Sequence, residues 1–273
     1  MAAPAFDVLV ASGDRAPSPA EQPYGGALAF PPAPRPYVVV NFVASIDGVA
    51  SLGVTDGTDS STLSGSSRED RYLMALLRAS ADVVLIGAGT LRGTPGHQWV
   101  PSAVAGDQGQ LIEAYRVATH GVAEPAPLVV VSGSGHLPAH VALDEPATST
   151  AVVTTPDGAG KVRKSHPLVS VIVVDGSGEM SGTAVIEAVT GAFGAGLVLC
   201  EGGPSLFGQL LAGGTVHELF LTVSPKIAGR DHDQARPGVV AGWAAAPDAL
   251  HDARLVSVRR SKDHLFLRYS LEA

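Results

Sequence analysis

The sequence predicts an α/β protein with a mainly parallel central sheet, helices on both faces and an antiparallel C-terminal edge. Between residues 37 and 200, short apolar runs rich in valine, isoleucine and leucine alternate with segments of helical pattern. Runs that are apolar at successive positions are typical of strands buried on both faces of a parallel sheet. The last 57 residues instead hold consecutive strand patterns, which are typical of antiparallel pairing.

Six runs have the pattern of buried strands, and turn-forming residues separate them. They are Tyr37–Ala44, Asp82–Gly87, Leu128–Ser132, Ala151–Thr155, Val169–Val174 and Leu197–Cys200. Because helical segments lie between successive runs, we expect them to form parallel βα units.

The helical segments have recognisable beginnings and ends. Ser66–Glu69 offers a capping box before the helix predicted at Arg71–Arg78. Further helices are expected near Gln110–Thr119 and at Asp157–Ser165, Ser181–Phe193 and Pro204–Ala212. Pro204 suits a first helical position, and Gly213 suits the end of that helix.

The two ends of the chain differ from this pattern. Near the C-terminus, Glu218–Val223 is a predicted strand, and Ala253–Arg260 with His264–Ser270 forms a predicted hairpin. The first 36 residues hold eight of the 20 prolines, with a dense run at Pro31–Pro36. Proline donates no amide hydrogen, so we expect residues 1–36 to form an extended arm outside the core and residues 37–273 to form one domain.

Composition excludes several classes of function. The formal net charge of −8 disfavours nucleic-acid and anionic-membrane partners, and the sequence has no apolar stretch of membrane-spanning length. The single cysteine, Cys200, excludes an internal disulfide and a cysteine-based zinc site. We therefore expect a cytoplasmic protein without a metal, nucleic acid or membrane partner.

Two predicted strands end in glycine motifs, where ligands of open α/β sheets bind. Gly87-Ala88-Gly89-Thr90 could donate amide and hydroxyl hydrogens to a phosphate, although a tight strand-to-loop turn is the alternative. Glu201-Gly202-Gly203-Pro204 opens a helix and could direct unpaired amides at a pyrophosphate. Glu201 is a candidate for acid–base chemistry, and its alternative role is to cap neighbouring amides.

A third motif follows the first predicted strand. Ser45-Ile46-Asp47-Gly48 has the composition of a β-turn in which Ser45 caps the backbone. The functional alternative places Asn41 and Asp47 as polar groups in a pocket above the sheet.

The order of these motifs along the chain is itself informative. Residues 41–48, 87–92 and 199–206, followed by residues 221–225, resemble the pyrimidine reductase family of riboflavin biosynthesis, whose fold is that of dihydrofolate reductase. The resemblance extends from Tyr37 to Tyr269. It implies an NADPH-dependent reduction of the ribosyl group of a ribosylaminopyrimidine 5′-phosphate to a ribityl chain, in a homodimer.

The resemblance also implies roles for individual residues. Asn41, Asp47 and Glu201 would face the reacting carbon and carry catalysis, whereas Ser45 and Arg78 would bind the substrate. The alternative for Arg78 is a solvated position near the end of its helix. The residues implied in cofactor binding, with Ser132 on the side of the adenosine 2′-phosphate, are Gly87, Gly89, Thr90, Ser132, Gly202, Gly203, Pro204, Ser205 and Leu206.

The chain departs from the family in two places that bear on its substrate. Many relatives have a lysine where this chain has Asn41, whereas relatives of the monofunctional kind have asparagine, so Asn41 indicates the monofunctional kind. Many relatives also have an acidic pair where this chain has Gly93–Gly96. The sequence also lacks the His-x-Glu and paired-cysteine elements of a zinc deaminase. Two alternatives therefore stay open: reduction of another pyrimidine or a pteridine such as dihydrofolate, and NADPH binding without catalysis.

Overall fold

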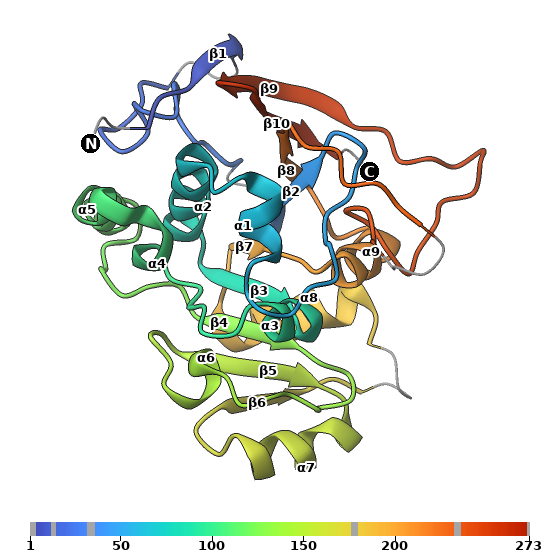
Figure 1. Ribbon diagram of the computed structural model, residues 1–273. Coiled ribbons are helices and arrows are strands. Elements are labelled where there is room, and N and C mark those ends of the chain that lie inside the picture. The colour runs from blue at the N-terminus through green and yellow to red at the C-terminus, as the bar shows by residue number, and fades with distance from the viewer. Residues whose placement is uncertain (1–3, 12–14, 32–35, 176–179, 232–235, 272–273) are drawn as a thin grey trace.

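The computed structural model describes residues 4–11, 15–31, 36–175, 180–231 and 236–271, so most of the Pro31–Pro36 run lies outside the described residues (Figure 1). The strands are β1 (Asp7–Val10), β2 (Tyr37–Ser45), β3 (Val83–Gly87), β4 (Leu128–Val131), β5 (Thr150–Thr154), β6 (Ser170–Val173), β7 (Leu197–Cys200), β8 (Glu218–Ser224), β9 (Arg254–Ser261) and β10 (His264–Ser270). They form one sheet in the order β1-β9-β10-β8-β2-β7-β3-β4-β5-β6.

The predicted fold class is confirmed. Strands β8, β2, β7, β3, β4, β5 and β6 pair in parallel, whereas β10, β9 and β1 add antiparallel pairs at one edge. Each of the six predicted buried strands is present, and their ends differ from the prediction by at most one residue. β6 is exposed or half-buried rather than buried, because it lies at the other edge of the sheet.

Helices cover both faces of the sheet (Figure 1). They are α1 (Asp59–Ser64), α2 (Arg68–Ser80), α3 (Ala88–Gly93), α4 (Ser102–Ala105), α5 (Gly109–His120), α6 (Val141–Asp144), α7 (Pro156–Ser165), α8 (Gly182–Phe193) and α9 (Pro204–Ala212). Leu76 of α2 and Ile112 of α5 belong to one apolar cluster, and Val185 of α8 and Leu210 of α9 to the other. In the part of the chain that the structure describes, no helix is long and apolar enough to span a membrane.

The N-terminal segment differs from the expected extended arm. β1 pairs with β9, and Phe6, Ala20, Tyr24 and Leu28 are buried in the same apolar cluster as α2. The guanidinium of Arg259 lies 3.7 Å from the centre of the Tyr24 ring, and its Nε donates to the Tyr24 carbonyl at 2.7 Å. The segment contains several prolines, but the apolar side chains between them pack against the domain instead of extending away from it.

Candidate functional site

A large cavity lies where several parallel strands end. Its walls come from the ends of β3 and β4, the segment that follows β7, the middle of β2, and the nearby parts of α1, α2, α3, α8 and α9. The cavity volume is about 1480 Å³. Pockets for one small ligand usually measure about 300–1,000 Å³, so this cavity has room for two ligands side by side.

The two glycine motifs form one continuous wall of this cavity. The Gly87 amide donates to the Gly202 carbonyl at 2.7 Å, which joins the end of β3 to the segment after β7. Gly202 has φ +80°, and a Cβ on it would lie 2.9 Å from Cζ of Phe42. The Gly202–Gly203 peptide bond is cis. The positive φ and the short distance to Phe42 mean that only glycine fits at position 202 without displacing the Phe42 ring.

The helices that follow these motifs differ in length. After Gly87 the chain turns directly into the six-residue α3, so the strand-to-loop turn that was the alternative for Gly87–Thr90 is not present. α9 begins at Pro204 as predicted, with Gly203 as its N-cap and no capping side chain. Ser205 and Leu206 line the cavity in the first turn of α9, where amide hydrogens have no intrahelical acceptor. This end of α9 suits an anionic ligand.

Glu201 forms a buried ion pair with Arg78. Nε of Arg78 donates to Oε1 of Glu201 at 2.8 Å and Nη2 donates to Oε2 at 2.7 Å, while the side chains are 1% and 7% exposed. The two-pronged geometry aligns the guanidinium with the carboxylate. Glu201 is therefore held by α2, rather than capping neighbouring amides.

Arg78 also anchors the segment that follows α3. Its Nη1 donates to the carbonyl oxygens of Val100 at 3.2 Å and Gln98 at 3.4 Å, and its Nη2 lies 3.1 Å from Nε2 of His97. Since arginine only donates, Nε2 of His97 is the acceptor. Burial lowers the pKa of His97 to about 3, and the positive charge of Arg78 adds to the effect. Arg78 is thus not solvated, and each nitrogen of its guanidinium already has a hydrogen-bond partner within the protein.

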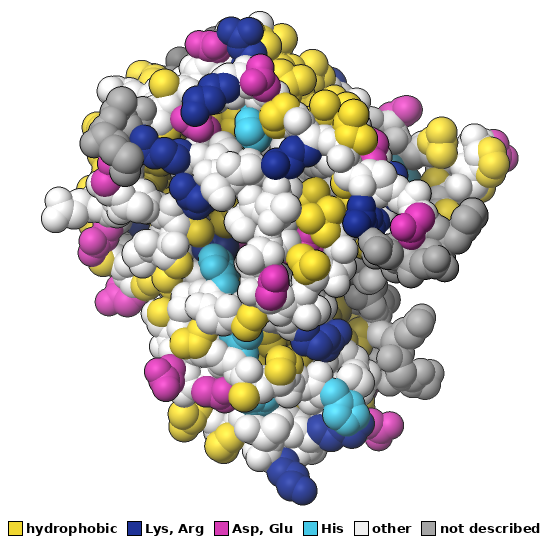
Figure 2. Space-filling model, in the orientation of Figure 1, with side chains coloured by type: hydrophobic (Ala, Val, Ile, Leu, Met, Phe, Trp, Pro, Cys, Tyr) yellow, Lys and Arg dark blue, Asp and Glu magenta, His cyan; other side chains and the backbone are white. Residues whose placement is uncertain are grey.

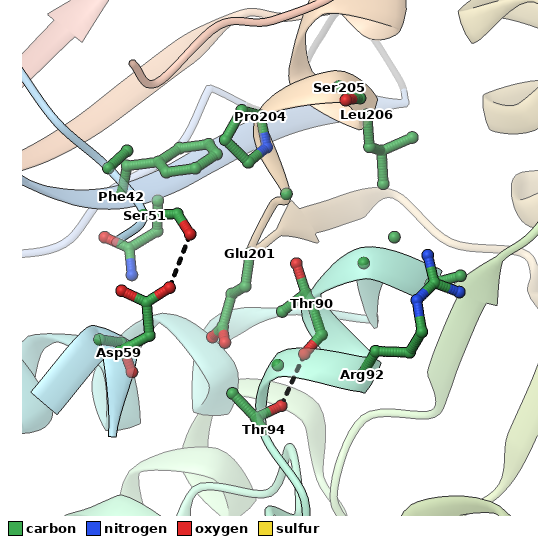
Figure 3. Close-up of a pocket in the computed structure, with 18 of the residues that line it drawn as sticks. Phe42, Ser51, Asp59, Thr90, Arg92, Thr94, Glu201, Pro204, Ser205 and Leu206 are labelled. Atoms are coloured by element: carbon green, nitrogen blue, oxygen red, sulfur yellow. Dashed lines mark hydrogen bonds between the residues drawn. The ribbon is translucent and has the colours of Figure 1, made fainter. Parts of the chain in front are cut away.

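Two aspartates of the cavity were not among the predicted residues. Asp59 accepts hydrogen bonds from Oγ of Ser51 at 2.6 Å and from the Leu52 amide at 2.8 Å (Figure 3). Asp70, on α2, is buried, and this burial raises the pKa of its carboxyl group, with a further contribution from the Glu201 carboxylate. Asp70 can therefore keep a proton at a higher pH than an exposed aspartate.

Asp47 and Ser45 lie outside the cavity lining. The Gly48 amide donates to the Ser45 carbonyl at 2.9 Å, and Oγ of Ser45 donates to Oδ1 of Asp47 at 2.7 Å, as in the predicted β-turn. The amides of Ala228 and Gly229 also donate to the Asp47 carboxylate, and these bonds hold its pKa well below the usual range. This geometry favours a role for Asp47 in joining two loops.

Most of the other predicted residues do line the cavity. These are Asn41, Gly87, Gly89, Thr90, Gly203, Pro204, Ser205 and Leu206. Two do not: Ser132 is buried after β4, and Gly202 contributes its carbonyl to the bond with Gly87. Figure 3 shows Thr90, Glu201 and Asp59 facing a common space, with the start of α9 above them.

The functional candidates that sequence patterns missed lie inside helices or irregular segments. Asp70 belongs to the first turn of α2, where acidic residues are common for reasons of helix stability alone. His97 lies in the segment between α3 and α4 and shows no recognisable motif. Only the capping pattern around Ser67, whose Oγ accepts from the Asp70 amide at 3.2 Å, marks this end of α2 in the sequence.

Comparison with known proteins assigns this arrangement to a family. Residues 36–241 match the model of the RibD C-terminal domain. A protein of Methanothermobacter thermautotrophicus named 2,5-diamino-6-ribosylamino-4(3H)-pyrimidinone 5′-phosphate reductase is 28% identical over 204 residues, which cover 71% of this chain and 80% of that protein. A protein of the same name from Archaeoglobus fulgidus is 30% identical over 203 residues, covering 72% and 84%.

Solved structures have the same fold. The diaminohydroxyphosphoribosylaminopyrimidine deaminase/5-amino-6-(5-phosphoribosylamino)uracil reductase of Thermotoga maritima matches 87% of this chain with a TM-score of 0.59 and 18% identity. This chain spans 57% of the length of that protein.

Proposed function

Because the chain belongs to the RibD C-terminal domain family, we propose that it reduces the ribosyl group of a ribosylaminopyrimidine 5′-phosphate to a ribityl chain, with NADPH as the reductant. The observation that carries this proposal is the division of one cavity into two parts. One part is walled by the glycine motifs and the uncapped start of α9, and the other by the buried carboxyl groups of Glu201 and Asp70.

The residues present fit a nicotinamide dinucleotide. The first-turn amides of α9 would hold its pyrophosphate, and Gly87, Gly89 and Thr90 would line its path along the end of β3. The bound cofactor would supply the hydride. The part of the cavity near Glu201 then remains for the pyrimidine substrate.

The carboxyl groups fit the proton movements of this reaction. The ribosyl ring opens when its ring oxygen gains a proton and the exocyclic nitrogen loses one, which leaves an imine. Reduction then adds a hydride to the imine carbon and a proton to its nitrogen. We propose that Asp70, whose pKa is raised by burial, supplies this proton, and that Glu201, held by Arg78, orients the substrate with Asn41.

The test is to follow NADPH oxidation by ultraviolet absorbance in three parallel reactions. The first contains the diamino ribosylaminopyrimidine phosphate, the second its deaminated counterpart and the third dihydrofolate. Oxidation with either ribosyl substrate is the expected result, and it also establishes whether reduction precedes deamination. Oxidation with dihydrofolate alone would replace the proposed substrate by a pteridine. No oxidation, with NADPH still bound, would favour a binding protein without this activity.

We also propose that the enzyme is a cytoplasmic homodimer. On the outer face of the antiparallel edge, Leu265 of β10 and Leu255 of β9 are 36% and 42% exposed, and Leu267 and Val258 are half-buried beside them. Burial of this apolar face against a second copy would remove it from water. Light scattering would measure a mass twice that of the monomer, and a monomeric mass would contradict the proposal.

On the face shown in Figure 2, acidic and basic side chains are interspersed over the described residues. This distribution, together with the net charge of −8, supports a small-molecule substrate rather than a nucleic acid.

A further inference from the structure

Arg92 is a cavity arginine whose charge no other described group neutralises. Three arginines line the cavity, namely Arg71, Arg78 and Arg92. Arg78 is occupied by Glu201, and the charge of Arg71 acts on the buried carboxyl group of Asp70, whereas Arg92 forms no hydrogen bond or ion pair with the residues that the structure describes, and its side chain is exposed. An arginine in this position has five N–H donors available for a ligand.

The position of Arg92 assigns it to the cofactor part of the cavity. It lies in the last turn of α3, which begins directly after Gly87. In the view of Figure 3, its guanidinium lies on the opposite side of Thr90 from Glu201 and Asp59, below Leu206 of α9. The end of β4 and the start of α8 complete this part of the wall. Arg92 is thus separated from the carboxyl groups that we assign to the substrate.

Resting on the proposed function, we propose that Arg92 binds the 2′-phosphate on the adenosine ribose of NADPH and so selects NADPH over NADH. The two cofactors differ only in this phosphomonoester, and the planar fork of arginine matches phosphate geometry. In a protein with a net charge of −8, an added phosphate dianion needs a local cation to bind well. Ser132, which the family resemblance places there, is buried and does not line the cavity.

Equilibrium binding without substrate tests this assignment. The probes are NADPH, NADH, 2′,5′-ADP and 5′-AMP, titrated against the full chain and against R92A, R92K and R163A. We expect R92A to raise the Kd of NADPH and 2′,5′-ADP by about 10- to 100-fold, the effect of losing a charge-assisted hydrogen bond, and to leave NADH and 5′-AMP unchanged. R92K keeps the charge and should restore part of the preference. Arg163 is an exposed arginine of α7 outside the cavity lining, so R163A should behave like the unaltered chain.

Other outcomes would overturn the assignment in distinguishable ways. Equal affinity of the unaltered chain for NADPH and NADH would refute selection by Arg92 while leaving a reductase in place. A loss of preference in K161A but not in R92A would move the phosphate to α7, where Nζ of Lys161 contacts the Ser134 carbonyl at 3.3 Å. An R92A chain with unchanged NADPH binding but a raised KM for the pyrimidine would assign Arg92 to the substrate phosphate. Binding of none of the probes would refute the proposed function itself.

Discussion

Replacing Arg78 by methionine removes one partner of a buried ion pair and leaves the other in place. The Glu201 carboxylate would lose donors at 2.8 and 2.7 Å, and the Val100 carbonyl would lose a donor at 3.2 Å. Because both side chains are almost fully buried, water cannot readily replace these donors. Breaking such a pair costs about 3–5 kcal/mol, a large part of the roughly 5–15 kcal/mol that stabilises most domains.

The double variant R78M/E201L supplies the matched comparison. Because it removes the uncompensated charge as well as the arginine, we expect it to regain most of the stability lost in R78M. Urea unfolding followed by circular dichroism measures the free energy of unfolding of each variant. The energetic coupling of Arg78 and Glu201 would be refuted if R78M lost less than about 1 kcal/mol of unfolding free energy. It would also be refuted if the loss in R78M/E201L equalled or exceeded the sum of the losses in R78M and E201L.

Kinetics separate positioning of Glu201 from direct binding of substrate. If Arg78 acts through Glu201, then R78M and E201Q should lose turnover to a similar degree, the double variant R78M/E201Q should lose little more, and NADPH binding should persist. R78K keeps the positive charge but cannot form the two parallel hydrogen bonds of the guanidinium, so it should recover only part of the turnover. A raised KM with unchanged kcat in R78M would instead support the direct substrate contact implied by family resemblance.

Three further predictions concern individual buried groups. The pKa of Asp70 is raised, so its stabilising effect is present below the unfolded pKa, near 3.8, and is lost as the pH rises through the folded pKa. D70N should therefore weaken the fall in unfolding free energy that urea unfolding measures as the pH rises above about 4, and should abolish turnover. The pKa of His97 is lowered to about 3, so its contribution is present above pH 6.5 and declines as the pH falls. H97Q should flatten the acid limb of the same measurement by up to about 1.4 kcal/mol per pH unit. Y24A should destabilise the chain by about 3–5 kcal/mol in urea, because Tyr24 packs against Phe6 and Arg259; an unchanged midpoint would show that the N-terminal segment is dispensable.

The parallel strands were predictable because their burial comes from residues within each strand. Leu197–Cys200, for example, is apolar at every position and matches β7 from end to end. β1 gave no such signal: Val8 and Leu9 are exposed, and the strand exists because β9 offers it backbone partners. Local sequence cannot report a partner that lies some 250 residues away along the chain.

The site was predictable to the extent that it depends on backbone geometry. Gly202 is needed where the chain passes close to Phe42 just before α9, and such a requirement leaves a glycine motif in the sequence. Asp70 has no comparable signature, because its raised pKa comes from burial between elements. Asp47 shows the opposite limitation: an Asp-Gly pair stabilises a turn whether or not a pocket lies beside it.

The contacts of Arg78 bring distant parts of the chain together at the candidate site. Its guanidinium joins α2 to Glu201 after β7 and to the backbone of Gln98 and Val100 after α3. A separate hydrogen bond, from the Gly87 amide to the Gly202 carbonyl, joins the two glycine motifs. Glu201 immediately precedes Gly202, so the ion pair with Arg78 is anchored next to the segment that opens α9. If the cavity holds cofactor and substrate as proposed, loss of Arg78 should disturb the alignment between the two ligands more than the affinity for either one alone.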